Sequence, residues 1–114
     1  DVAVRILLES AEENGGTISG DGLQAMHQAV PQAALYVWDQ DSKKRNSGGL
    51  SAAVHAKCAV ADRLIAFVTS ANLTSAAMER NMELGVLIRG GAIPERLHSH
   101  LEALALTRNI VSWR

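Results

Sequence analysis

Two apolar runs in the middle of the chain, residues 54–61 and 64–69, are separated only by Asp62 and Arg63. Short runs rich in Val, Ile and Ala that lie this close together are typical of an antiparallel β-hairpin. Because a hairpin fixes which residues face each other on the two strands, this feature constrains the fold more than any other. The sequence therefore predicts two paired strands joined by a tight turn.

The rest of the chain alternates between strand-like and helix-like segments without internal repeats. Asp21 can cap a helix that Pro31 ends, and Pro94 suits the first turn of a last helix. Such alternation indicates an α/β fold, with α+β as the alternative, built on one layered sheet. Further strands are expected at 2–8, 34–38, 82–88 and 109–113, and helices at 21–30, within 70–81 and from 94 onward.

Composition limits the classes of function. The formal net charge is −1, which argues against a protein that wraps nucleic acid by bulk electrostatics, although a local basic site stays possible. The single cysteine, Cys58, cannot form an intrachain disulfide and is expected to fill the core in a reducing compartment. No apolar run approaches the roughly 20 residues that span a bilayer. We therefore expect a cytoplasmic protein.

The first run of the hairpin carries His55 and Lys57 within otherwise apolar sequence. Residues two apart on a strand share a face, so the imidazole and the ammonium point the same way. This pairing suits a phosphate, because the ammonium can neutralise an oxygen while the imidazole attacks phosphorus. The alternative is a solvated strand edge that carries one histidine and one lysine without chemistry.

Three elements in order resemble the motifs of the phospholipase D superfamily. His55, Lys57 and Asp62 match the family's H-x-K-x(4)-D pattern. Ser70 and Asn72 match its G-S-x-N element, with Thr69 in place of the usual glycine. Asn81 and Glu83 match its N-x-E element. The match covers residues 54–88 strongly and the flanks weakly. The resemblance implies a phospholipase D-like layered fold, a mixed sheet flanked by helices, over a single domain of residues 1–114. Because the sequence starts in a strand-like segment without Met, we expect a fragment that lacks its N-terminal part.

The resemblance also implies a role for each site residue. His55 would be the nucleophile and form a phosphohistidine intermediate. Lys57, Ser70 and Asn72 would bind the phosphate oxygens, while Glu83 would accept a proton from the other ring nitrogen of the histidine. The family chemistry uses no cofactor and no metal.

Two features of the motif set leave alternatives open. Asp62 lies in the expected turn, where it either bonds backbone N–H groups or takes part in the chemistry. Family members supply a second H-x-K motif to protonate the leaving oxygen, and this chain has one. We expect a homodimer in which each copy gives a His55 to a shared cleft, as in single-motif relatives of the bacterial nuclease type.

The resemblance predicts a phosphodiesterase. The expected intracellular location and the absence of an interfacial amphipathic helix from the sequence pattern favour nucleic acid over lipid as its substrate. The sequence is most similar to the phospholipase D-like proteins found with bacterial DISARM antiphage systems, which implies a defence context and partners from a defence complex. A basic cluster at residues 43–45 is either a solvated loop or a lip that guides phosphates into the site. The alternatives are a noncatalytic phosphate-binding or assembly module, a phospholipid hydrolase, and a structural domain with an accidental motif.

Overall fold

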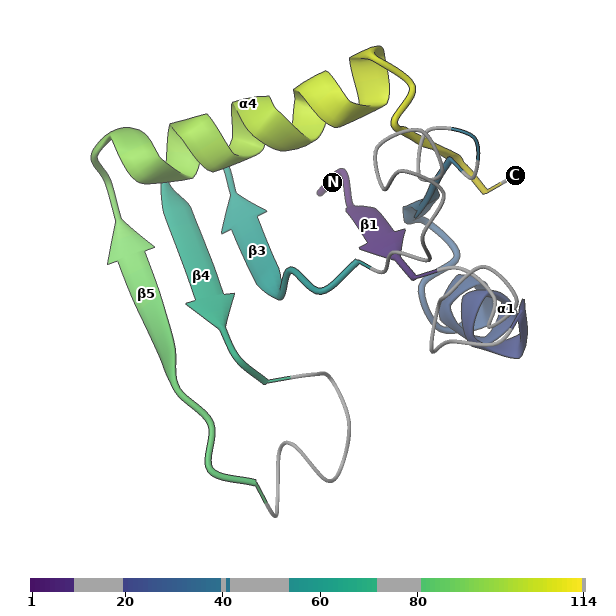
Figure 1. Ribbon diagram of the computed structural model, residues 1–114, viewed down its shortest axis with the longest axis horizontal. Helices are drawn as coiled ribbons and strands as arrows, with labels where there is room; N and C mark the ends of the chain where they lie inside the picture. The colour runs from purple at the N-terminus through teal and green to yellow at the C-terminus, as the bar shows by residue number, and fades with distance from the viewer. Residues whose placement is uncertain (10–19, 40, 42–53, 72–80, 114) are drawn as a thin grey trace. The chain divides into compact units, whose positions relative to one another are not determined.

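The computed structural model describes residues 1–9, 20–39, 41, 54–71 and 81–113, and the chain divides into two compact units (Figure 1). One unit comprises Asp1–Val54 and Leu104–Arg114, and the other comprises His55–Ala103. Strands and helices alternate along the described residues, which confirms the predicted α/β class. The helix predicted within residues 70–81 and the basic cluster at 43–45 fall outside the described residues, apart from residues 70, 71 and 81.

The first unit contains a three-stranded sheet in the order β1-β2-β6. Strand β1 (Arg5–Leu8) pairs in parallel with β2 (Ala34–Trp38), and β2 pairs antiparallel with β6 (Ile110–Ser112). Two parallel neighbours need a crossover connection, and helix α1 (Gly20–Ala29) lies in it. The expected strands at 2–8, 34–38 and 109–113 and the helix at 21–30 are thus confirmed, with shorter ends in β1 and β6.

The core of this unit is small and aliphatic. Leu23 of α1, Leu35 of β2 and Ile110 of β6 are each no more than 6% exposed. Glu9, which follows β1, is buried to the same degree, and its carboxylate accepts a hydrogen bond from the backbone N–H of Val54. A buried carboxylate needs such donors, because burial without them costs several kcal/mol.

The second unit contains the predicted hairpin, extended by one further strand. Its first strand begins at Cys58 and not at Val54, so the expectation that His55 and Lys57 lie on this strand was wrong. Strands β3 (Cys58–Ala61), β4 (Ile65–Thr69) and β5 (Gly85–Arg89) form an antiparallel sheet in that order. Helix α4 (Ala92–Leu106) follows β5 and crosses the end of the sheet at which β5 ends (Figure 1). Pro94 in its first turn is fully buried. No helix among the described residues is both long and apolar enough to cross a membrane.

One face of this sheet is covered at only one end. Val60, Ala66 and Ile88 face one another across the three strands, and Ala66 has no exposed surface. The next row on the same face is exposed and consists of Cys58, Val68 and Val86. The expectation that Cys58 fills the core was therefore wrong, because the thiol lies in the row farther from the end that α4 crosses.

The turn between β3 and β4 places two residues other than glycine in the left-handed region. Asp62 has φ of 53° and Arg63 has φ of 59°, and Leu64 N donates to Ala61 O at 2.9 Å to close the turn. Positive φ at both central positions matches the hairpin twist and suits Asp, Asn and Gly. Arginine gains nothing from this conformation, so Arg63 carries conformational strain.

Replacing Arg63 by glycine is expected to raise the free energy of unfolding by about 0.5–1 kcal/mol. Relief of the left-handed strain exceeds the extra entropy that glycine gives the unfolded chain. Urea unfolding followed by circular dichroism measures the difference. Arg89→Gly, on the exposed side of β5, is the matched control and should destabilise, because glycine weakens a strand. A midpoint for Arg63→Gly at or below that of the parent protein would contradict the strain argument.

Candidate active site

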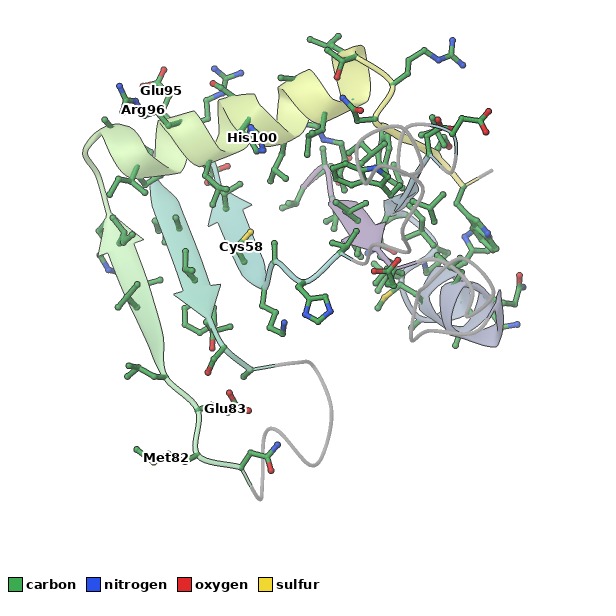
Figure 2. All side chains as sticks on the ribbon, viewed as in Figure 1. Cys58, Met82, Glu83, Glu95, Arg96 and His100 are labelled. Carbon is green, nitrogen blue, oxygen red and sulfur yellow. The ribbon has the colours of Figure 1, made fainter. Side chains whose placement is uncertain are left out.

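The antiparallel order of β3, β4 and β5 gathers the motif residues at one end of the sheet. His55 and Lys57 precede β3, Ser70 follows β4 and Glu83 precedes β5. Where neighbouring strands run in opposite directions, the start of one lies beside the end of the next. Figure 2 shows Glu83 on the segment that leads into β5, at the end of the sheet away from Glu95 and the rest of α4.

Regular pairing at this end of the sheet stops at the row of Lys57, Thr69 and Gly85. Thr69 N donates to Lys57 O at 3.0 Å, and Thr69 faces Gly85 on β5. His55 and Glu83 each lie two residues beyond this row, before the first residues of β3 and β5. The hydrogen bonds among the described residues include none between these two side chains, so the expected contact of Glu83 with the imidazole stays a prediction.

Ser70 holds Glu83 in this structure. Ser70 Oγ donates to Glu83 Oε2 at 2.5 Å and accepts from Leu84 N at 3.1 Å. The backbone N–H of Ser70 also donates to Leu84 O at 3.0 Å, which ties the end of β4 to the segment before β5. A hydroxyl has one proton, so Ser70 cannot donate to Glu83 and to a phosphate at the same time. The predicted role of Ser70 as a phosphate donor therefore requires that its proton leave Glu83.

Lys57 and His55 lie where a phosphate can reach them. His55 is exposed, and Lys57 is half-buried with Nζ donating to the carbonyl oxygen of His55 at 2.7 Å. This bond holds the ammonium beside the backbone of the histidine. A lysine ammonium has three protons, so it can donate to a phosphate oxygen while this bond persists.

Thr69, which replaces the family's glycine, stabilises the chain as it leaves β4. Its Oγ1 donates to Leu84 O at 3.3 Å and accepts from Ala71 N at 3.1 Å. Directly opposite lies Gly85, where an added Cβ would lie 3.0 Å from Phe67 Cε2 and 3.1 Å from the Thr69 side chain. Our sequence analysis missed Gly85, although a glycine within a strand pattern is a signal of close approach.

Asp62 and Asn72 are not placed at this end by the described structure. Asp62 lies in the turn between β3 and β4, at the end of β3 opposite to the one that His55 precedes. This placement favours the turn role over direct chemistry. Asn72 lies outside the described residues, and Asn81 is exposed. Among the described residues, no group of three or more His, Cys, Asp or Glu side chains is arranged to hold a metal ion.

Gly85→Ala is expected to destabilise the protein by about 1–3 kcal/mol, because the new methyl group has no space beside Thr69 and Phe67. The midpoint of urea unfolding measures this effect. Adding Phe67→Leu, which removes the nearest ring atom, should recover part of the loss and make the two changes non-additive. A Gly85→Ala protein within 0.5 kcal/mol of the parent, about the range of a neutral surface change, would show that the contact is not tight.

Comparison with known proteins gives a family match. Residues 1–105 match the family model described as cardiolipin synthase, PLD-like domain. Neither the curated proteins nor the solved structures include a significant match to this chain. The family match covers most of the 114 residues and includes the three motif elements. The chain therefore belongs to the PLD-like domain family of the phospholipase D superfamily, a superfamily of phosphodiesterases.

Proposed function

We propose that this protein is a phosphodiesterase that cleaves nucleic acid, with His55 as the nucleophile. One observation supports this most directly: within one compact unit, the sheet brings His55, Lys57, Ser70 and Glu83 to the same end. An exposed imidazole beside an ammonium is suited to nucleophilic attack on an anionic phosphodiester. Membership in a superfamily of phosphodiesterases gives the same reaction class.

In the first step, a ring nitrogen of His55 attacks phosphorus. The N–P bond forms, and the P–O bond to the leaving group breaks with its electron pair on the leaving oxygen. That oxygen takes a proton from a second group. Lys57 donates to a nonbridging oxygen and offsets the charge that develops there, together with Asn72. Glu83 accepts a hydrogen bond from the N–H of the other ring nitrogen, which fixes the tautomer that attacks.

In the second step, water attacks the phosphohistidine. An O–P bond forms, the N–P bond to His55 breaks, and the proton of the water passes to the group that had protonated the leaving oxygen. The product is a phosphate monoester, and the imidazole is regenerated. The reaction therefore needs a nucleophile and a second group that acts first as an acid and then as a base, and one H-x-K motif supplies only the nucleophile.

We propose that a second copy of this chain supplies the other histidine in a homodimer. The single motif and the resemblance to nuclease-type relatives support this arrangement. Apolar side chains on β4 and β5 also stay exposed and offer surface for a partner; Phe67, Val68, Val86 and Leu87 are each 42–54% exposed. Association with defence-system proteins, an antiphage role and a cytoplasmic location are further proposals supported by the resemblance alone.

The family description names cardiolipin synthase, so a phospholipid is the second candidate substrate. The full chain is incubated with single-stranded DNA, with duplex DNA and with phosphatidylglycerol vesicles, each with and without EDTA. We expect cleavage of DNA that EDTA leaves unchanged, because imidazole and ammonium groups take the place of a metal ion in the proposed reaction. His55→Ala should lower kcat by at least about 10³-fold and abolish acid-labile phosphate on the protein.

His100→Ala is the matched control, because His100 is an exposed histidine on α4 (Figure 2). It should retain full activity. If the protein turned over the lipid and not DNA, the same mechanism would be that of a phospholipase, and the proposed nucleic acid substrate would be wrong. A parent protein that binds DNA without cleaving it, with binding unchanged in His55→Ala, would instead support a noncatalytic module. Sedimentation of the same samples tests for a mass twice that of one chain.

Substitutions of the two carboxylates in the motif set, Asp62 and Glu83, are expected to differ in their effect on kcat. Asp62→Asn should keep kcat within about threefold of the parent, because asparagine also tolerates the left-handed turn. Glu83→Gln should lower kcat on the order of 10²-fold, because an amide holds the imidazole tautomer poorly. Initial rates on DNA at saturating substrate make the comparison. A large loss in Asp62→Asn with an unchanged melting temperature would assign Asp62 to the chemistry.

A further inference from the structure

We propose that Thr69 is a positioning residue for the Glu83 carboxylate, a role that rests on the proposed function of Glu83 in orienting the imidazole. Thr69 is the last residue of β4 and stands where the family motif has glycine, so the resemblance assigns it no role. It lies in the same compact unit as Glu83. Its hydroxyl binds the backbone next to both Ser70 and Glu83, which a glycine cannot do.

The Thr69 hydroxyl links two segments of the chain. Its Oγ1 donates to Leu84 O at 3.3 Å and accepts from Ala71 N at 3.1 Å. Leu84 directly follows Glu83, and Ala71 directly follows Ser70. A hydroxyl can donate one hydrogen bond and accept others, so both bonds form at the same time. Thr69 therefore joins the segment that leaves β4 to the segment that enters β5.

The backbone of Leu84 supports the group that binds Glu83. Ser70 Oγ, which donates to Glu83 Oε2 at 2.5 Å, accepts from Leu84 N at 3.1 Å. Leu84 O accepts from Ser70 N at 3.0 Å as well as from the Thr69 hydroxyl. Ser70 and Leu84 are exposed, where water competes for their hydrogen bonds, whereas Thr69 is half-buried. The Thr69 bond thus anchors this exposed cluster to a less exposed side chain.

Thr69 is itself held in place from both neighbouring strands. Its backbone N–H donates to Lys57 O at 3.0 Å, and its side chain lies against Gly85, where an added Cβ would be 3.1 Å from Thr69 Oγ1. A β-branched side chain also has few χ1 rotamers on a strand. The hydroxyl therefore has a defined position, which it passes to Leu84 and the Ser70–Glu83 pair. Misplacing a catalytic group by about 1 Å costs on the order of 10²-fold in rate.

The test compares Thr69→Val and Thr69→Ser in the full chain. Valine keeps the branched shape without the hydroxyl, and serine keeps the hydroxyl. Each protein is measured by DNA cleavage, by hydrogen exchange at the Ala71 amide and by the ¹³C NMR signal of the Glu83 carboxylate. We expect Thr69→Val to lower kcat about 10- to 100-fold with KM nearly unchanged, to speed exchange at Ala71 and to shift the Glu83 signal. Thr69→Ser should retain most of the activity.

Thr107→Val is the matched control. Thr107 is an exposed threonine of the first unit whose Oγ1 donates to Leu104 O at 3.4 Å, so this change also removes a hydroxyl that binds a backbone carbonyl. It should leave kcat and the Glu83 signal unchanged. A second comparison combines Thr69→Val with Glu83→Gln. Because Thr69 acts through Glu83, the double variant should lose little more kcat than Glu83→Gln alone.

The outcomes separate this proposal from the proposed function. Faster exchange at Ala71 with unchanged kcat and an unchanged Glu83 signal would overturn the positioning role, as would losses that multiply in full in the double variant. An unaltered Ala71 amide in Thr69→Val would overturn the contact itself. If the parent protein cleaves no phosphodiester, the proposed function fails, and the Glu83 signal alone decides whether Thr69 positions the carboxylate. Should Thr69→Val fail to fold, Thr69→Ala removes the same hydroxyl and should give the same loss.

Discussion

The antiparallel pairing of β3, β4 and β5 is the interaction on which the candidate site depends. Backbone hydrogen bonds fix the register so that the residues before β3, after β4 and before β5 meet at one end. A slip by one residue would turn Lys57 and its neighbours to the opposite face. The tight turn at Asp62 and Arg63 sets that register, so the strain in Arg63 is tolerated for the pairing that it allows.

Beyond the last paired row, side-chain hydrogen bonds connect the end of β4 to the segment before β5. Ser70 Oγ accepts a hydrogen bond from Leu84 N and donates one to Glu83. Thr69 Oγ1 donates to Leu84 O and accepts from Ala71 N. Of these bonds, the one from Ser70 Oγ holds the Glu83 carboxylate. Two of the family-matched residues, Ser70 and Glu83, thus act on each other in the structure.

Two carboxylates, those of Glu83 and Glu9, each accept a hydrogen bond from a residue distant in sequence. Glu83 binds a hydroxyl at the exposed end of the second unit, and Glu9 binds a backbone N–H in the buried part of the first. The motif contains Glu83 but not Glu9. Hydrogen bonding to a buried group is more demanding than hydrogen bonding at the surface, because water cannot replace a lost partner. A residue outside the motif can therefore be as constrained as one inside it.

The sequence by itself determined the hairpin, the α/β class and the identity of the motif residues, because apolar periodicity, turn residues and residue spacing are local properties. It placed α1, β2 and α4 close to their observed bounds for the same reason. Only the tertiary structure decided that Cys58 is exposed, that Ser70 donates to Glu83, that Gly85 faces Thr69 and that Glu9 holds Val54. Each of these depends on register or on burial between segments distant in sequence, and the spacing of residues along one segment contains neither.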